Sequence, residues 1–255
     1  SKIGKHDYAV KCFKEALKIH EDLEVRDYLA QALIHTGELN EAYEQLEKLA
    51  EAEPDNDAIF IQMAQVAYMM ENYTAMAQAC ERALLANKDN AQAHYLYAQA
   101  CIGQDDVINA IAMLTKAITL KEDMADAYLL RGQTLLKMGD INGAEEDCNH
   151  LMADYSGNED VLMLNARIKR AKGDSDAAIE AYGRVIDANP FSVDAFKERG
   201  AVKYEKGDMK GAQEDAQHAM ELEPKDMENV SGDYSAEGIE QKTKSAYSNL
   251  NPLGL

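Results

Sequence analysis

The feature that most constrains this chain is a pattern of residues that recurs every 34 positions. Between Ala125 and Asn158, two stretches whose apolar residues have helical spacing flank a turn made of glycine and aspartate. The same turn returns one and two periods later, so that the three pairs are Gly139-Asp140, Gly173-Asp174 and Gly207-Asp208. Two amphipathic stretches with a glycine stop between them are typical of a helix pair. The chain is therefore predicted to be an array of helix pairs, which adds length without adding separate cores.

Other residue types keep fixed places in each period. In the unit that begins at Ala125, Tyr128 and Leu151 hold places that are again occupied by large apolar residues 34 positions later. Gly132 and Ala144 hold places that are again occupied by small residues. Proline, which cannot continue a helix, stands where a second helix must end, at Pro54, Pro190 and Pro224. This pattern resembles the tetratricopeptide repeat (TPR) family. The resemblance implies an all-α fold, namely a right-handed α-solenoid of stacked antiparallel helix pairs (a TPR superhelix).

The resemblance covers residues 23–226 and divides them into six tandem units. These are residues 23–56, 57–90, 91–124, 125–158, 159–192 and 193–226. Glu71 and Asp105 replace the glycine between the two helices of their units, and Met76 replaces an alanine of a second helix. We expect these departures to weaken single turns only.

The two ends of the chain do not form full units. Residues 1–22 are interpreted as the second helix of a truncated N-terminal repeat, in which Val10, Phe13 and Leu17 have less cover than their counterparts elsewhere. Such an uncapped helix favours a homo-oligomer. Residues 227–255 are interpreted as a loop, a capping helix at roughly 236–250 and a tail, which in a second interpretation folds back into a neighbouring groove.

Composition limits the classes of partner and the compartment. The chain has 46 acidic and 26 basic side chains, a net charge of −20, which argues against a nucleic-acid partner. It has no run of about 18 apolar residues, so membrane insertion is not expected. The four cysteines form no CxxC pair, which favours a reducing compartment and a cytoplasmic location. A leader peptide or further repeats before Ser1 are left open.

Motifs of enzymes were sought and not found. The sequence has no phosphate-binding loop, no HExxH pair and no GxSxG elbow, and its six histidines lack metal-ligand spacing. Cys80, Cys101 and Cys148 occupy apolar places of the repeat, where cysteine acts as a small hydrophobic residue. We therefore expect no enzyme activity, no metal and no cofactor.

The first helices of stacked pairs line a concave face, so residues 34 apart form columns along it. The ninth position of each unit contributes Gln31, Gln65, Gln99, Gln133, Arg167 and Ala201. The fifth contributes Asp27, Ile61, Tyr95, Leu129, Met163 and Lys197, and the twelfth contributes Ile34, Tyr68, Ile102, Leu136, Arg170 and Tyr204. These positions share one helical face, distinct from the face that packs against the next helix.

An apolar strip with amide side chains along its centre predicts a groove for an extended peptide or protein segment. The amides can bond the ligand backbone while the strip accepts ligand side chains. The predicted groove residues are Gln31, Gln65, Gln99, Gln133, Arg167, Arg170, Ile61, Tyr95, Leu129, Met163, Tyr68, Ile102 and Leu136. The alternative is that glutamine is simply a good helix former and that some apolar positions lie partly under their neighbours.

Charge is distributed unevenly along the repeats. Residues 23–56 contain two basic and nine acidic side chains, whereas residues 159–192 contain five and six. A ligand with a basic end near the first unit and an acidic end near Arg167 and Arg170 would fit this gradient. The second-position acids Asp126, Asp160 and Asp194 are explained by the dipole of their own helices.

Some members of the family hold the acidic tail of heat-shock chaperones with a clamp of Lys, Asn and Arg. This chain has other residues at the clamp positions, namely Asp27, Gln31, Gln62, Gln92 and Leu96, so a chaperone adaptor of that type is not expected. The sequence instead favours a non-catalytic scaffold that binds a protein segment during assembly of a larger complex. Two alternatives stay open: the repeat portion of a longer enzyme or secretion-machine component, and a structural array that oligomerises through its ends.

Overall fold

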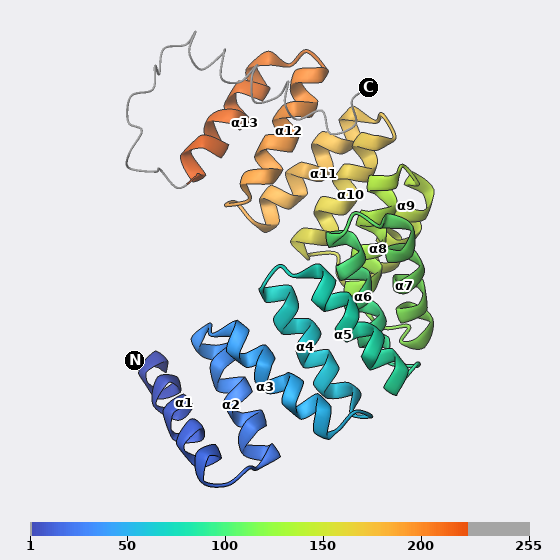
Figure 1. The fold of residues 1–255 in the computed structure, drawn as a ribbon. Helices are drawn as coiled ribbons and strands as arrows, with labels where there is room; N and C mark the ends of the chain where they lie inside the picture. The colour runs from blue at the N-terminus through green and yellow to red at the C-terminus, as the bar shows by residue number, and fades with distance from the viewer. Residues whose placement is uncertain (1, 224–255) are drawn as a thin grey trace. The chain divides into compact units, whose positions relative to one another are not determined.

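The computed structural model describes residues 2–223, which form thirteen α-helices and no strand (Figure 1). The helices are α1 Lys2–Ile19, α2 Leu23–Thr36, α3 Leu39–Ala52, α4 Asp57–Met69, α5 Tyr73–Ala86, α6 Ala91–Gly103, α7 Val107–Leu120, α8 Ala125–Met138, α9 Ile141–Asp154, α10 Glu159–Ala171, α11 Ser175–Ala188, α12 Val193–Glu205 and α13 Met209–Leu222. Within this part of the chain, no helix has the length and apolar character needed to cross a membrane. The expected capping helix and tail lie outside the described residues.

The helix bounds follow the 34-residue period. The first helices of successive pairs begin at Leu23, Asp57, Ala91, Ala125, Glu159 and Val193. Each pair consists of two helices of 13 or 14 residues joined by a short turn. The chain is thus all-α and built from antiparallel helix pairs, which confirms the predicted fold class.

Side-chain caps explain where the helices begin. The first N–H groups of a helix have no acceptor within it, and an Asp or Asn side chain just before the helix can accept from them. The carboxylates of Asp140 and Asp174 accept from the N–H groups of Gly143 and Ala177, each at 3.0 Å. Equivalent caps are formed by Asp22, Asn56, Asn72, Asn90, Asp106, Asn158 and Asp208. Some of the acidic side chains of the chain therefore stabilise helix N-termini.

Residues in the left-handed conformation end the first helices. This conformation is adopted by Gly37, Gly139, Gly173 and Gly207, with φ between 79° and 92°. Glu71 and Asp105 adopt it too, with φ of 55° and 60°, although a side chain is unfavourable there. After Glu71 the N–H of Asn72 still donates to the carbonyl of Ala67 at 2.9 Å. Both turns therefore keep the glycine geometry with a strained residue.

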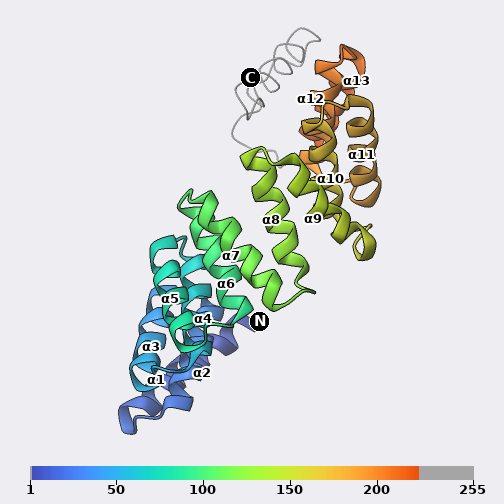
Figure 2. The ribbon, with the colours of Figure 1, turned by 90° about the vertical axis from the view of Figure 1, so that its right-hand side faces the viewer.

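Contacts divide the chain into two compact units, Ser1–Thr134 (unit 1) and Leu135–Leu255 (unit 2), and the division falls inside α8. In unit 1 each helix from α1 to α7 packs against the next, and α4 also packs against α6 (Figures 1 and 2). The largest fully buried side chains of its core include Leu33, Leu46, Phe60 and Met63.

The expectation that Val10 has less cover than its counterparts in other repeats is not met. Val10 is 5% exposed, because α1 packs along α2 and places it against Leu29 and Leu33. Phe13 and Leu17 are partly buried against the same cluster. The α1 helix is thus an integral part of the core of unit 1.

Unit 2 is built in the same way. The α9 helix packs against α10, and the helices from α10 to α13 stack one against the next (Figure 2). Tyr182 of α11 is fully buried in a core that also contains Leu162, Val185 and Val202. This order of packing places α10 and α12, which carry the predicted groove positions of unit 2, next to α11.

Candidate functional site

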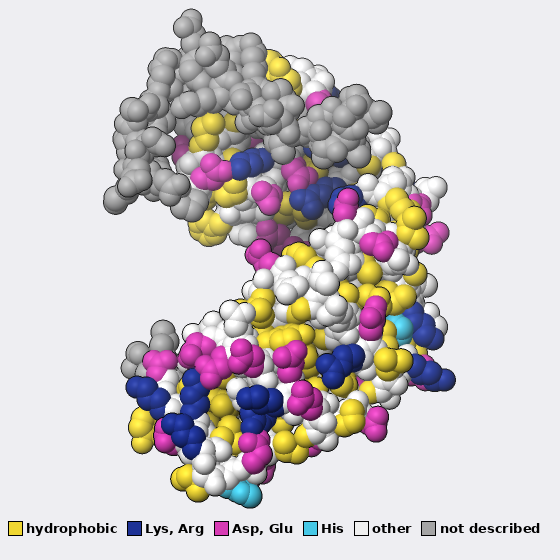
Figure 3. All heavy atoms as spheres, in the orientation of Figure 1, with side chains coloured by type: hydrophobic (Ala, Val, Ile, Leu, Met, Phe, Trp, Pro, Cys, Tyr) yellow, Lys and Arg dark blue, Asp and Glu magenta, His cyan; other side chains and the backbone are white. Residues whose placement is uncertain are grey.

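The predicted groove positions of unit 1 lie on α2, α4, α6 and α8, and we call them the first-helix face of unit 1. Its members are Gln31, Gln65, Gln99, Gln133, Ile34, Ile61, Tyr68, Tyr95, Ile102 and Leu129. Gln31, Gln65 and Tyr68 are exposed, and the other side chains are half-buried. Where unit 1 lies in Figure 3, the visible surface mixes hydrophobic, acidic and basic side chains. The face is therefore partly apolar and open to a ligand.

The glutamines of this face have different partners. Gln31 donates from Nε2 to the carboxylate of Asp27 at 2.7 Å, and Gln99 donates to the hydroxyl of Tyr95 at 3.3 Å. Gln65 and Gln133 make no side-chain hydrogen bond within the described part of the chain. An amide without a partner can both donate to and accept from a ligand backbone. Gln65 and Gln133 therefore offer the most available hydrogen-bonding groups of the face.

Tyr95 lies at the middle of the face. Its side chain packs against two core clusters, one formed by α2 to α6 and one formed by α6 to α8. Burial, the carboxylate of Asp126 and the phenol of Tyr68 together raise the pKa of Tyr95. The phenol therefore stays neutral and can donate a hydrogen bond. Tyr95 of α6 is thus influenced electrostatically by side chains of α4 and α8.

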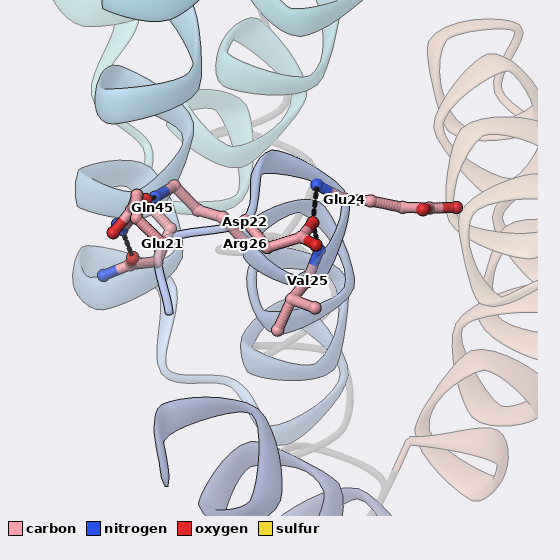
Figure 4. Close-up of polar contacts among 6 residues, drawn as sticks. All are labelled: Glu21, Asp22, Glu24, Val25, Arg26 and Gln45. Carbon is pink, nitrogen blue, oxygen red and sulfur yellow. Dashed lines mark hydrogen bonds and ion pairs between the residues drawn. The ribbon is translucent and has the colours of Figure 1, made fainter. Parts of the chain in front are cut away.

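Basic side chains are scarce on these helices. The α4 and α6 helices contain no Lys or Arg. The single arginine of α2, Arg26, is 8% exposed because it bonds the carboxylate of Glu21 and the amide oxygen of Gln45 (Figure 4). That guanidinium lowers the pKa of Glu21. Arg26 therefore serves the packing of α2 against α3 and offers no charge to a ligand.

In unit 2 the structure corrects the predicted groove at Met163. Its side chain is only 7% exposed, because α10 buries four consecutive residues, from Val161 to Leu164. Met163 packs with Ala166 and Val185 in the core. It therefore does not line an open surface, whereas Leu136 of α8 is half-buried.

The two predicted basic groove residues of unit 2 are paired within the chain. Arg167 makes a two-pronged bond to Glu198, which raises the pKa of Arg167, and the hydroxyl of Tyr182 donates to the same carboxylate at 2.7 Å. Arg170 bonds Glu205 at 2.6 Å. The neighbouring lysines 169 and 172 share Glu145. Carboxylates of unit 2 therefore already neutralise most of the positive charge of α10, which leaves little to attract the acidic end of a ligand.

Three family models described as tetratricopeptide repeat match this chain, at residues 23–66, at 91–124 and 125–152, and at 163–221. Together the matched stretches cover more than half of the sequence. The chain belongs to the tetratricopeptide repeat family. A search of curated proteins by sequence gave no match.

Solved structures of other TPR proteins share the fold. A TPR protein from Parabacteroides merdae ATCC 43184 is 16% identical, with a TM-score of 0.70 over 96% of this chain and 93% of its own. PilW, a widely conserved type IV pilus biogenesis factor, is 16% identical, with a TM-score of 0.69 over 78% and 92%. YrrB, a TPR protein with an unusual peptide-binding site, is 17% identical, with a TM-score of 0.59 over 78% and 97%. At these identities the likeness shows the TPR fold alone.

Two features of the TPR units escaped sequence reasoning. The side-chain amides of Asn87 and Asn90 donate to the carboxylate of Asp57 at 2.7 and 2.9 Å, which holds the pKa of Asp57 below its ordinary value. The amide oxygen of Gln62 is buried without a hydrogen-bond donor in the described structure. The signal for Gln62 was present, because Leu96 and Leu130 hold its place in the next two TPR units.

The thiols of the TPR chain belong to its cores rather than to its candidate face. Cys80, Cys101 and Cys148 are buried, and burial raises the pKa of Cys80 to about 12 and that of Cys148 to about 11. Burial also raises the pKa of Cys101. These thiols stay neutral and behave as small apolar side chains.

Proposed function

We propose that this TPR chain is a non-catalytic scaffold that binds an extended peptide or protein segment on the first-helix face of unit 1, in the assembly of a larger complex. TPR proteins in general act through protein partners, and the choice of this face is the more specific claim. One observation carries it: Gln31, Gln65, Gln99 and Gln133 occupy equivalent places on four successive first helices, between two columns of residues that are apolar and partly exposed except at Asp27.

The chemistry of the face suits an extended ligand. A segment without regular structure has unpaired N–H and C=O groups, and glutamine can satisfy both kinds. Tyr68 is 48% exposed, and Ile61 and Ile102, which pack against the cores of unit 1, are only half-buried, so all three leave apolar surface exposed. YrrB, which shares the fold, has a peptide-binding site. These features support binding of a segment rather than of a folded domain.

The test begins with a ligand chosen without bias. A random peptide library displayed on phage is selected against the full chain, and the selected peptides are labelled with fluorescein for anisotropy measurements. Changing Gln65, Gln99 and Gln133 together to Ala should weaken binding at least about tenfold, because each lost backbone hydrogen bond contributes about 0.5–1.5 kcal/mol.

A matched triple variant controls for the loss of glutamine as such. Gln78, Gln104 and Gln217 are exposed and lie outside the face, so changing these three to Ala should leave affinity unchanged. Circular dichroism confirms that both triple variants are folded. Equal affinity of the wild type and the variant in residues 65, 99 and 133 would place the binding site elsewhere.

Self-association through α1 is a second candidate function. Tyr8 and Ile19 of α1 are 71% and 87% exposed, and exposed apolar residues of this size favour contacts between proteins. Light scattering across a concentration series should show a dimer in the wild type that is lost in the Tyr8→Ser, Ile19→Ser variant. A monomer at every concentration in the wild type rejects this candidate.

A further inference from the structure

The first helices of unit 1 change in character from α2 to α8. Their fifth-position column begins with Asp27 and continues along the first-helix face with Ile61, Tyr95 and Leu129. Asp27 lies beyond the first turn of α2, where the helix dipole does not account for an acidic residue. Its carboxylate accepts from the amide of Gln31 at 2.7 Å and makes no ion pair within the described part of the chain. The column therefore offers one negative charge followed by three apolar side chains.

The apolar part of this column is continuous. Ile61 and Tyr95 pack against one core cluster, which extends from α2 to α6, and Tyr95 also packs against the cluster of α6 to α8. Ile61, Tyr95 and Leu129 are all half-buried, so each leaves part of its side chain exposed. The α4 and α6 helices are in direct contact, and the axes of packed helices lie about 8–10 Å apart. The column therefore advances by about this distance from one first helix to the next.

A matching pattern is present in residues 241–255. This segment has no Asp or Glu, although the chain has a net charge of −20. Lys244, Tyr247, Leu250 and Leu253 follow one another at every third residue, so that one positive charge precedes three apolar side chains. A chain in the polyproline conformation has three residues per turn and rises about 3.1 Å per residue, which brings such side chains to one side at steps of about 9 Å.

We propose that the first-helix face of unit 1 binds residues 241–255 of a second copy, with Lys244 beside Asp27 and the three apolar side chains along the rest of the column. The charges are complementary, the steps are similar in length, and the neighbouring glutamines bond the backbone of the segment. Pro252 supports the extended form, because it fixes its own φ and biases the residue before it away from helical geometry. This inference rests on the proposed function, since it names the segment that the glutamines hold.

Such a contact between copies is head-to-tail. Each copy has one face and one segment, so association can continue from copy to copy. A contact between two α1 helices, in contrast, uses the same surface twice and stops at two copies. The two candidates for self-association therefore differ in the assembly that they build and in the residues that they require.

A different role for the segment uses some of the same residues. Ile239, Thr243, Ala246, Tyr247 and Leu250 fall on one face of a helix, as expected of a cap on the last TPR unit. A cap stabilises its own chain, whereas the proposed contact stabilises an assembly. Leu250→Ser should therefore leave the free energy of unfolding unchanged at concentrations where the chain is monomeric, as measured by urea denaturation. A lower free energy of unfolding would support the cap and overturn the inference.

The probe is a fluorescein-labelled, C-terminally amidated peptide of residues 241–255, and its anisotropy is measured with the full chain. A second peptide exchanges two neighbours, Asn249→Leu and Leu250→Asn, which keeps composition and charge but breaks the spacing of three. It should bind at least about tenfold more weakly, because one leucine leaves its apolar site. The triple glutamine-to-alanine variant of the face should weaken binding of the first peptide by a similar factor.

A charge exchange tests the partner of Asp27. The Lys244→Glu peptide should bind the wild type about tenfold more weakly, and Asp27→Lys should weaken binding of the unchanged peptide to a similar degree. The two changes together should restore most of the binding. Asp55→Lys is the matched control and should have little effect on either peptide, because Asp55 is exposed, has no partner among the described residues and lies outside the face. Circular dichroism checks the fold of each variant.

Light scattering with the full chain tests whether a second copy supplies the segment. The mean mass should rise once the concentration passes the dissociation constant of the peptide, and Lys244→Glu should keep the chain monomeric. The Tyr8→Ser, Ile19→Ser variant should associate as the wild type does. A wild type that stays monomeric well above that dissociation constant overturns the inference.

The outcomes separate this inference from the proposed function. Phage-selected peptides that depend on the three glutamines, together with no binding of the 241–255 peptide, overturn the inference and leave the proposed function standing. Equal affinity of the original and the exchanged peptide, or of the wild type and Asp27→Lys for the original peptide, also overturns it. If neither the phage-selected peptides nor the 241–255 peptide depends on the glutamines, both proposals are rejected.

Discussion

Glu71 shows how one residue can carry strain that its counterparts avoid. It holds the left-handed position after α4 with φ of 55°, and the equivalent residue after α2 is Gly37 with φ of 82°. A side chain in this conformation costs about 1–2 kcal/mol, and glycine costs about 0.5–1 kcal/mol through the freedom of the unfolded chain. Glu71→Gly should therefore raise the free energy of unfolding by about 0.5–1 kcal/mol, as measured by urea denaturation.

Gly37→Ala provides the opposite change at the equivalent turn. Nothing lies within 4 Å of the added methyl group, so its effect reports the backbone alone. It should lower the free energy of unfolding by about 1 kcal/mol. A Glu71→Gly variant that is less stable than the wild type would contradict this account of the turn.

Asp57 links stability to pH. Hydrogen bonds from Asn90 and Asn87 hold its pKa below the ordinary 3.8, so the folded state favours the carboxylate. Its contribution is present above pH 3.8 and is lost as the pH falls through the lower, folded pKa. Asp57→Asn should therefore destabilise the protein at neutral pH, and the difference from the wild type should shrink on acidification below about pH 4.

The exposed Asp55 is a suitable control for this pH dependence, because it lies in the turn before α4 and has no partner among the described residues. The difference between Asp55→Asn and the wild type should vary little over the same acidic range. A difference for Asp57→Asn that stays constant from neutral to acid pH would show that the asparagines do not favour the carboxylate.

The residue scale also shows what sequence can reveal. The turns at Asp140, Asp174 and Asp208 were predictable, and their caps are local, because each capping residue lies three positions from the N–H group from which it accepts. The bonds from Asn87 and Asn90 to Asp57 span 30 and 33 positions. Only the folded chain brings these together, and polar residues at both places are equally compatible with exposed loop ends.

At the scale of the element, α10 carries two arginines with unequal roles. Arg167 bonds Glu198, whose side chain is 16% exposed, whereas Glu205, the partner of Arg170, is 53% exposed. Removing Arg167 leaves a mostly buried carboxylate with Tyr182 as its main remaining partner. Arg167→Met should therefore lower the free energy of unfolding by about 1–2 kcal/mol, as measured by urea denaturation.

Arg170→Met is the matched change on the same helix. Exposed ion pairs contribute little, so its expected cost is less than about 0.5 kcal/mol. If both changes lower the free energy of unfolding equally, the carboxylate of Glu198 is stabilised by groups other than Arg167. The bond between α10 and α12 would then not contribute as proposed.

The elements themselves were predictable, whereas their exposed sides were predictable only in part. Apolar residues at helical spacing and turn residues every 34 positions indicated the helix pairs. The α10 helix, however, buries four residues in a row, so periodicity does not distinguish its packing side from an open side, and Met163 was assigned wrongly. The partners of Arg167 and Arg170 lie 31 and 35 positions away, on α12.

At the scale of the whole molecule, charge is shared equally between the units. Residues 1–134 contain 12 basic and 22 acidic side chains, and residues 135–255 contain 14 and 24. The difference lies in placement, because α10 alone has three basic side chains while α4 and α6 have none. The first-helix face of unit 1 therefore combines apolar surface and amides, and two of its helices have no basic side chain, which favours a ligand with positive charge.

Side-chain amide signals of glutamine test the central claim most directly. In the ¹⁵N-labelled protein, the NH₂ signals of Gln65, Gln99 and Gln133 can be assigned by comparison with the single Ala variants. Addition of a phage-selected peptide should shift these signals in proportion to the occupancy that anisotropy measures, while those of Gln78 and Gln217 stay in place. Shifts confined to Gln78, Gln217 and the second helices would contradict binding on the first-helix face of unit 1.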